Sequence, residues 1–299
     1  MQNYKDFWDN KASTTKGAFI AVDGSASEHM LQLTGAYSAR QVEAALDLRP
    51  ADRVLELGCG VGRIGLELAA GVAHWEGADI SANMLKVARE RFAARTNAGF
   101  TELTRTSLRP LADASFDKAY CIAVFIHMDK EDFYIYLEET ARVLKPGGLL
   151  YFDAWNLASP TGWRRYAMEI NQHRDADPAQ RKDVARNQFT NPEEVRAFLQ
   201  HAGFELLWLC GDSPWVQAVA MRRGGGDLAA QTQRVAAAAP RIVYTPLWTE
   251  LFSTMLEVFA EGTLTAQQGL DILADDSRGE EVRMFREVYG DVLRHAAGR

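Results

Sequence analysis

The sequence predicts an α/β protein with a doubly wound, mostly parallel sheet and a helical extension at its carboxyl end. Two observations predict this fold class. Between residues 53 and 155, short apolar runs alternate with longer amphipathic segments, as they do where crossover helices connect parallel strands. After residue 226, apolar residues recur at helical spacing.

Five strands are expected to alternate with helices. An apolar run at 54–57 predicts the first strand, and 64–70 has the composition of a helix. Residues 73–79 predict the second strand, after which Ser81 can cap a helix. The remaining elements are a strand near 100–103, a strand within 116–125, a helix at 131–144 and, after the helix-stopping Lys-Pro-Gly-Gly at 145–148, a strand at 149–153.

Two further strands complete a seven-stranded sheet. Residues 190–194 combine a cap, a first-turn proline and early acids, which predicts a helix. The runs 204–209 and 215–221 show no helical pattern between them, so they should pair antiparallel at the sheet edge. The expected domains are an N-terminal helical cap (1–50), a central domain (51–223) with a lid insertion (156–189), and a helical extension (224–299) that begins with a glycine linker at 224–226.

Composition excludes several classes of function. The 299 residues are 47% hydrophobic with a net charge of −7, which favours a globular protein and argues against nucleic acid as a partner. The first residues do not resemble a secretory signal and no apolar run would cross a bilayer, so we expect a cytoplasmic protein with no membrane segment. The cysteines and histidines lack the spacing of metal ligands, so no metal is expected.

A glycine-rich turn follows the first expected strand. Gly58, Gly60 and Gly62 alternate, and Glu56 lies two residues before the first of them. Glycines at such a turn allow the backbone to approach a nucleotide closely. Dinucleotide enzymes share this architecture, but their third glycine is replaced here by Arg63, which disfavours a pyrophosphate.

The run 54–63, Val-Leu-Glu-Leu-Gly-Cys-Gly-Val-Gly-Arg, resembles the first motif of the class I S-adenosylmethionine-dependent methyltransferases. The segments 111–117, 141–148 and 189–204 resemble later parts of the same family's domain. The resemblance covers roughly residues 51–222. It implies a Rossmann-like methyltransferase fold and S-adenosyl-L-methionine as the cofactor.

The resemblance also implies a set of cofactor residues. The acid matching Glu56 helps to hold the methionine end, Asp79 matches the acid that binds the ribose hydroxyls, and Ile80 and Met84 match apolar contacts of the adenosine. Many relatives carry a further acid for the adenine amine, and this chain has Thr-Ser-Leu at 106–108 instead. The expected cofactor residues are Glu56, Gly58, Cys59, Gly60, Gly62, Arg63, Asp79, Ile80, Met84, Ser107 and Leu108. Arg63 could instead be a solvated first-turn residue.

One histidine is a candidate catalytic residue. His127 follows the fourth expected strand, where ligands gather at the carboxyl ends of parallel strands. A neutral imidazole there could remove a proton from an acceptor hydroxyl or amine. A lone histidine is more often a packing or hydrogen-bonding residue, and the sequence leaves both readings open.

The substrate candidates are aromatic and basic residues. Tyr4 and Trp8 could form a flap over the cofactor, or simply the apolar face of an N-terminal helix. Trp155, Arg164 and Arg165 lie at or within the expected lid, where the arginines suggest an anionic acceptor. The alternative for the two arginines is a solvated turn.

The sequence therefore predicts methyl transfer to an O or N atom of a small-molecule metabolite. A nicotinamide-dependent oxidoreductase would share Asp79 but should contain the missing third glycine. A non-catalytic partner subunit could retain the fold and use residues 227–299 for docking. The extension could also form a homodimer, cover the active site or pad the core, and the sequence favours none of these.

Overall fold

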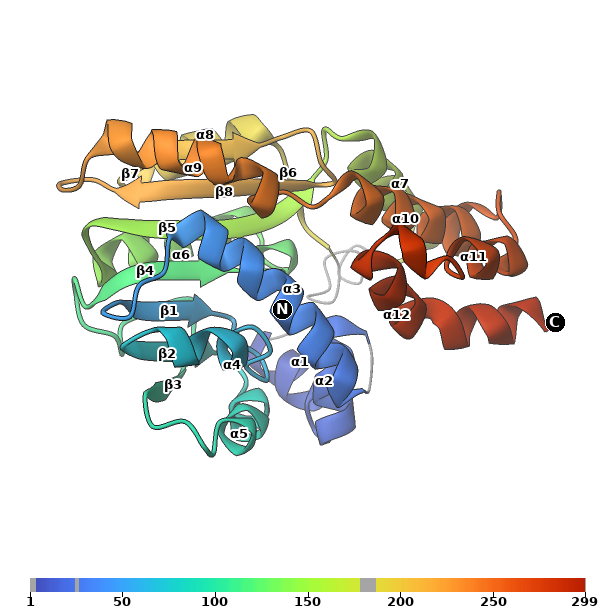
Figure 1. Cartoon of the computed structure of the whole chain (residues 1–299), viewed down its shortest axis with the longest axis horizontal. Helices are drawn as coiled ribbons and strands as arrows, with labels where there is room; N and C mark the ends of the chain where they lie inside the picture. Colours follow the sequence, from blue (N-terminus) through green and yellow to red (C-terminus); the bar gives the residue numbers. More distant parts are fainter. Residues whose placement is uncertain (1–3, 25–26, 178–186, 299) are drawn as a thin grey trace.

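One mixed sheet of eight strands organises the chain (Figure 1). The computed structural model describes residues 4–24, 27–177 and 187–298. The strand order is β3-β2-β1-β4-β5-β8-β7, and β6 pairs beside β5. The strands are β1 (Arg53–Leu57), β2 (His74–Asp79), β3 (Ala98–Glu102), β4 (Phe116–Cys121), β5 (Leu144–Asn156), β6 (Phe189–Thr190), β7 (Phe204–Cys210) and β8 (Trp215–Arg222).

The strand directions confirm the predicted fold class. β1 pairs in parallel with β2 and β4, and β4 pairs in parallel with β5. β8 runs antiparallel to both β5 and β7, as expected for two strands without a helix between them. The two-residue β6 adds to the seven expected strands. The carboxyl ends of β1, β2, β4 and β5 therefore meet at one edge of the sheet, where α/β folds bind ligands.

Helices cover both faces of this sheet. They are α1 (Tyr4–Lys11), α2 (Thr15–Asp23), α3 (Glu28–Leu46), α4 (Gly65–Leu68), α5 (Ala82–Arg91), α6 (Lys130–Val143), α7 (Pro160–Gln172), α8 (Pro192–His201), α9 (Leu228–Ile242), α10 (Pro246–Leu256), α11 (Ala266–Ile272) and α12 (Glu280–Ala297). Apolar side chains of α3, α4, α5 and α9 share one core cluster, and those of α6 and α8 share the other. Figure 1 shows α3 and α9 on the near face of the sheet.

Local capping explains where several helices begin. The hydroxyl of Ser81 accepts a hydrogen bond from the backbone N–H of Met84 at the start of α5, as predicted. The side chain of Asn191 accepts from two backbone N–H groups at the start of α8, directly before Pro192. These polar side chains satisfy backbone donors that have no partner within the helix.

One expectation about an element boundary was wrong. β5 begins at Leu144, before the Lys-Pro-Gly-Gly that was expected to precede it, because the β4–β5 pairing shifts register there and absorbs the turn within the ladder. The expected lid insertion contains α7, which begins after the Ser159 cap with Pro160 in its first turn. Residues 178–186 of that insertion lie outside the described residues.

The carboxyl-terminal helices divide into two groups. α9 packs against α3 and β7, and its Val235, Ala238 and Ile242 belong to the core of the sheet. The glycines before it pack tightly, since a Cβ on Gly147 would lie 2.9 Å from the backbone of Gly225. α10, α11 and α12 form a separate apolar cluster that contacts α7 and α3. The boundaries of the three domains and the homodimer stay predictions.

Candidate functional site

A cavity lies at the carboxyl ends of β1, β2 and β4, beneath the N-terminal helices. Its walls are mostly apolar, with carboxylates at the ends of β1 and β2. The cavity brings together most of the residues expected from the sequence. Those that line it are Tyr4, Trp8, Glu56, Gly58, Cys59, Gly60, Arg63, Asp79, Ile80, Met84 and His127.

The glycine turn shapes one wall of the cavity. Gly58 and Gly60 both adopt left-handed backbone conformations, with φ of 68° and 53°. A Cβ on Gly58 would lie 2.4 Å from a methyl group of Val124, and one on Gly60 would lie 3.1 Å from a methyl group of Val22. The turn therefore presents backbone rather than side chains. Gly62 instead faces a ring of the core, since its Cβ would lie 2.5 Å from Phe92.

Asp79 ties this turn to the start of α5. Its Oδ2 accepts a hydrogen bond from the backbone N–H of Gly60 at 2.7 Å, and its Oδ1 accepts one from that of Ser81 at 2.8 Å. Burial raises the pKa of this carboxyl, and the two backbone N–H groups oppose that shift. Each oxygen keeps a further lone pair that a ligand hydroxyl could use.

Glu56 sits deeper, at the end of β1. Its Oε2 accepts a hydrogen bond from the Tyr120 hydroxyl at 2.6 Å, and that hydroxyl accepts one from the Trp75 indole at 3.0 Å. Burial raises the pKa of Glu56 to about 8, against the opposing effects of the Tyr120 hydrogen bond and the positive charge of Arg63. At neutral pH the carboxyl therefore holds a proton in the absence of a cationic ligand.

Arg63 offers a hydrogen-bond donor without a partner. Its Nη1 donates to the Ser38 hydroxyl at 3.2 Å. Its buried Nε has no hydrogen-bond partner among the described residues, although the side chain lines the cavity. A buried donor of this kind is costly unless a ligand satisfies it. This fits an anionic group at the same end of the cavity as Glu56.

Helix α1 is fastened over the cavity. Asp9 accepts hydrogen bonds from the Ser81 hydroxyl at 2.7 Å and from the backbone N–H of Asn83 at 3.2 Å. Tyr4 and Trp8, from the same helix, line the cavity below. Trp8 also packs against an apolar cluster, so both interpretations of these aromatics stay predictions.

His127 follows β4 in a short 3-10 turn and lines the cavity. Its ring meets that of Trp8 edge to face, with centroids 4.9 Å apart. Burial lowers the pKa of His127 to about 4, so the imidazole is neutral at physiological pH. Its buried Nδ1 has no hydrogen-bond partner within the described part of the chain.

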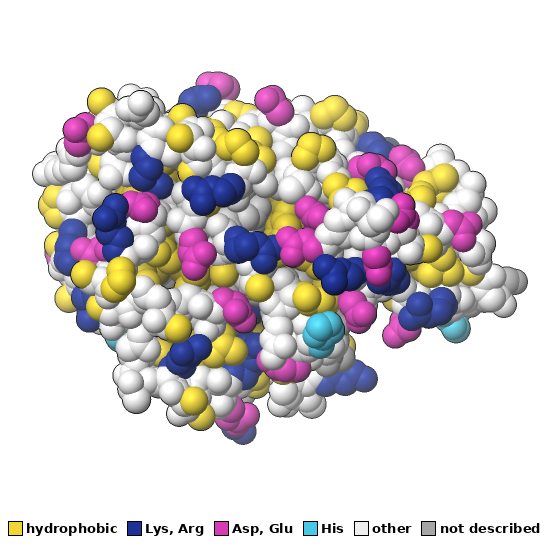
Figure 2. Space-filling view, viewed as in Figure 1, with side chains coloured by type: hydrophobic (Ala, Val, Ile, Leu, Met, Phe, Trp, Pro, Cys, Tyr) yellow, Lys and Arg dark blue, Asp and Glu magenta, His cyan; other side chains and the backbone are white. Residues whose placement is uncertain are grey.

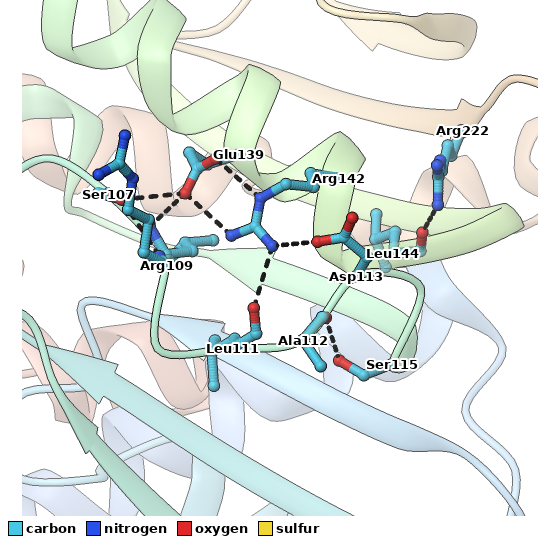
Figure 3. Close-up of polar contacts among 11 residues, drawn as sticks. Ser107, Arg109, Leu111, Ala112, Asp113, Ser115, Glu139, Arg142, Leu144 and Arg222 are labelled. Carbon is cyan, nitrogen blue, oxygen red and sulfur yellow. Dashed lines mark hydrogen bonds and ion pairs between the residues drawn. The ribbon is translucent and has the colours of Figure 1, made fainter.

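Ser107 and Leu108, the two adenine candidates, do not line the cavity. The Ser107 hydroxyl donates to Glu139 at 3.1 Å, and the backbone N–H of Leu108 donates to the same carboxylate at 2.7 Å. Arg142 pairs with Glu139 and binds the carbonyl of Leu111, so these contacts fasten the loop before β4 to α6 (Figure 3). Ser107 and Leu108 therefore stabilise the loop, and the neighbouring Thr106 lines the cavity.

The predicted substrate residues at the end of β5 and on α7 are not part of the cavity wall. Trp155 stacks on Trp215 with ring centroids 4.5 Å apart. Arg164 forms ion pairs with Glu257 and Glu261, and Arg165 pairs with Glu169 at 3.0 Å. The two arginines thus hold α7 and its neighbours together, and their role toward a substrate stays a prediction.

Sequence reasoning missed part of the cavity wall. Asp132 and Tyr136, one turn apart on α6, both line the cavity. Their spacing of four residues places them on one face of the helix. That spacing, on the helix after the fourth strand, was the signal available in the sequence.

The surface carries charges of both signs. On the face drawn in Figure 2, basic and acidic side chains lie interspersed, and apolar side chains occur among them. The described helices include none long and apolar enough to span a membrane. The described residues also contain no group of three or more potential metal ligands.

Comparison with known proteins places the cavity within a recognised domain. Residues 54–148 match the family model described as a methyltransferase domain. The chain is 34% identical over 171 residues to a demethylmenaquinone methyltransferase of Mycobacterium sp. (strain KMS), covering 55% of this chain and 68% of that protein. It is 31% identical over 131 residues to an O-methyltransferase of Aspergillus nomiae, covering 43% of this chain and 57% of that protein.

Solved structures share the fold. The magnesium protoporphyrin IX methyltransferase of Synechocystis PCC 6803, solved with bound SAH, is 18% identical with a TM-score of 0.52. The match covers 73% of this chain and 97% of that one. At this identity the likeness concerns the architecture of the sheet and its helices.

Proposed function

The chain belongs to the class I S-adenosylmethionine-dependent methyltransferases, and we propose that it methylates an O or N atom of a small-molecule metabolite. The observation that carries the proposal is the cavity itself. It has one buried carboxyl at the end of β1, another at the end of β2, and an exposed glycine backbone between them. S-adenosyl-L-methionine is the methyl donor of the family.

The nucleoside end of the cofactor would lie against Asp79. Its two oxygens are fixed by Gly60 and Ser81, so their remaining lone pairs are already oriented for the ribose hydroxyls. Ile80 and Met84 would supply apolar contacts to the adenosine, and Thr106 a hydroxyl near it.

The methionyl end would lie between Glu56 and Arg63. An ammonium group would lower the pKa of Glu56, since an adjacent positive charge favours the ionised carboxylate, and the carboxyl would then release its proton to solvent. The unpartnered Nε of Arg63 would donate to the carboxylate of the cofactor. These two residues would thus recognise opposite charges of the same amino acid.

The bound cofactor supplies a methyl group on a sulfonium, which is an excellent leaving group. The remaining task of the protein is to position the acceptor and exclude water. Trp8 and Tyr4 would cover the reacting atoms with aromatic surface. His127 would accept a hydrogen bond from the acceptor and take up its proton, because its imidazole is neutral and lacks a protein partner.

The acceptor is proposed to be small and largely uncharged. The cavity walls are mainly apolar, and both arginines expected to favour an anionic acceptor are engaged with glutamates. The mycobacterial relative is named for methylation of demethylmenaquinone, a small molecule, and the fungal relative is named as an O-methyltransferase. That class of acceptor is extended to this chain as part of the proposal.

Calorimetric titration tests the proposal. The chain should bind S-adenosylmethionine with one site per molecule, and Glu56→Ala combined with Asp79→Ala should weaken binding by at least about 100-fold. The matched control is Glu205→Ala with Asp291→Ala, which removes two exposed acids that are paired elsewhere. The control should bind as the wild type does.

Two results would overturn the proposal. Unchanged cofactor affinity in the Glu56 and Asp79 double variant would remove the assigned site. Tighter binding of a nicotinamide dinucleotide than of S-adenosylmethionine, measured by competition, would favour the oxidoreductase instead. Product analysis by NMR, with acceptor libraries and labelled cofactor, would then separate O, N and C methylation.

A further inference from the structure

A buried polar network fixes the chain where it leaves α9. The Gln217 side chain on β8 donates to the Tyr151 hydroxyl at 2.7 Å and to the carbonyl of Ile242 at 2.9 Å. Gln41 on α3 donates to the same carbonyl at 2.9 Å. The Gln217 Oε1 accepts from the backbone N–H of Tyr244 at 3.1 Å. The segment entering the extension is therefore held on both sides of residue 243.

This anchoring places the side chain of Tyr244, which lies just before α10, against the sheet. The Tyr244 hydroxyl donates to Oδ2 of Asp153 at 2.9 Å. Asp153 lies near the end of β5 and is 1% exposed. Its other oxygen, Oδ1, accepts from the backbone N–H of Ala123 at 2.7 Å. One carboxylate thus connects the extension to the residue that follows β4.

Ala123 forms part of the cavity wall. It lines the cavity together with its neighbours Ile122 and Val124. Its φ is 59°, in the left-handed region that residues other than glycine rarely adopt. Such a conformation persists only where surrounding contacts hold it. The hydrogen bond to Asp153 is a contact of this kind.

Asp153 also acts on Arg63. Burial raises the pKa of Asp153 to about 6, while hydrogen bonds from Ala123 and Tyr244 and the positive charge of Arg63 oppose the shift. Arg63 and Ala123 both line the cavity, so the charge of Asp153 bears on this wall through a hydrogen bond at Ala123 and through electrostatic attraction for Arg63. Loss of the Tyr244 hydrogen bond would raise the pKa of Asp153 further. A smaller fraction of Asp153 would then be ionised and able to attract Arg63.

We propose that Tyr244 is a positioning residue that makes the C-terminal extension part of the cofactor site. Through Asp153 it fixes the backbone of Ala123 in the cavity wall and maintains the negative charge that attracts Arg63, at the end of the cavity assigned to the methionyl group. This inference rests on the proposed function, because it assigns the methionyl end to the region of Arg63. A helical extension that merely padded the core would not need the hydroxyl.

The test compares two ligands on the full-length chain. Tyr244→Phe should weaken binding of S-adenosylhomocysteine by about tenfold, because an ionised hydrogen-bond acceptor loses its donor. Binding of adenosine, which lacks the methionyl end, should stay within about twofold. Calorimetry measures both affinities together with the fraction of competent sites.

The matched control is Tyr289→Phe. Tyr289 is also a partly buried tyrosine of the extension that packs on Phe285, and its hydroxyl makes no hydrogen bond identified among the described residues. This variant should leave both affinities unchanged. If Tyr244→Phe does not fold, Asp153→Asn provides the second variant. It keeps an oxygen for Ala123 and removes the charge near Arg63, and it should show the same selective loss.

The outcomes separate the inference from the function on which it rests. Equal losses for S-adenosylhomocysteine and adenosine would indicate a general structural effect and overturn the inference. Unchanged S-adenosylhomocysteine affinity in Tyr244→Phe would overturn it as well, while leaving the proposed function in place. A wild-type chain that binds neither ligand would overturn both.

Discussion

The two ends of the sheet's carboxyl edge are built from different chemistry. At the β1–β2 end, Glu56 and Asp79 bring carboxylates to a glycine backbone. At the β5–β8 end, aromatic rings fill the same position, and Trp215 lies 4.5 Å from Trp155 and 4.4 Å from Trp248 between ring centroids. The first end is arranged to meet a ligand and the second to hold the C-terminal helices. The difference teaches that one edge of a sheet can present carboxylates and backbone to a cavity at one end and pack helices through aromatic rings at the other.

His127, at the border of the two regions, offers the largest effect. His127→Ala should lower the rate of methyl transfer by about 10²- to 10⁴-fold, because the neutral imidazole would no longer receive the acceptor proton. Cofactor affinity should change little. Single-turnover kinetics with an acceptor found by screening measures the rate, and His201→Ala at the exposed end of α8 is the control. An unchanged rate would assign His127 to packing.

Trp215→Ala tests the structural role of the aromatic rings at the β5–β8 end of the edge. Trp215 is 6% exposed and contacts rings from β5 and α10, so its truncation should destabilise the protein by about 3–5 kcal/mol. Urea denaturation measures the loss. Trp163→Ala, at a site 56% exposed, should cost less than about 0.5 kcal/mol. If folded Trp215→Ala also lost cofactor affinity, the separation of the two ends would fail.

Glu56→Gln tests whether Glu56, at the β1–β2 end of the edge, loses a proton when the cofactor binds. Since burial raises the pKa of Glu56 to about 8, binding of a cationic cofactor at pH 7 should release up to about one proton from the wild type. The glutamine variant should release none from this position and bind about tenfold more weakly. Calorimetry in buffers of different ionisation enthalpy measures the proton count. Equal release in both proteins would contradict the assignment.

The same substitution changes stability with pH. The native pKa of Glu56 exceeds its ordinary value of 4.5, so the folded ligand-free protein keeps a proton that the unfolded chain loses. Wild-type stability should therefore fall as pH rises from 4.5 toward 8, by up to about 1.4 kcal/mol per pH unit for this group. Glu56→Gln should remove that part of the slope. Asp153, whose pKa is raised to about 6, should still contribute to the fall of stability with rising pH, at pH values below about 6.

Arg164→Ala should give the smallest effect. The guanidinium is 29% exposed and paired with Glu257 and Glu261, and partly exposed ion pairs contribute less than about 1 kcal/mol. Thermal unfolding should shift only slightly, and the KM for the acceptor should stay within about twofold. A large rise in that KM would instead support the substrate role expected from the sequence.

The β1–β2 end of the edge could be predicted because a nucleotide site requires glycines and acids at fixed positions along the sequence. Alternating glycines with an acid two residues before them, and a second acid at the end of the next strand, are visible without a structure. Asp153 could have been found by the same rule, since it too lies near the carboxyl end of a parallel strand. Tyr244 could not, because nothing in its local sequence indicates which strand it meets.

The fold was predictable where periodicity and caps agreed. Ser81 and the Asn191–Pro192 pair marked helix starts that the structure confirms. The Lys-Pro-Gly-Gly at 145–148 does follow the end of α6, as predicted, but it belongs to β5. Local turn chemistry cannot show that the β4–β5 pairing shifts register to accommodate these residues. α7 was missed although Ser159 and Pro160 form a capped helix start of the same kind.

The attachment of α1 has a consequence for how ligands enter and leave. Asp9 binds Ser81 and Asn83, which lie two and four residues after Asp79, the carboxyl proposed to bind the ribose. Ser81 contacts both Asp9 on α1 and Asp79. Opening of α1 would therefore also free the Ser81 side chain beside Asp79. Amide hydrogen exchange in α1 and cofactor dissociation should then follow a common opening step and slow together when product is bound. A fusion tag placed before Tyr4 would adjoin the helix expected to open, so a tag at the opposite terminus is the better choice for kinetic work.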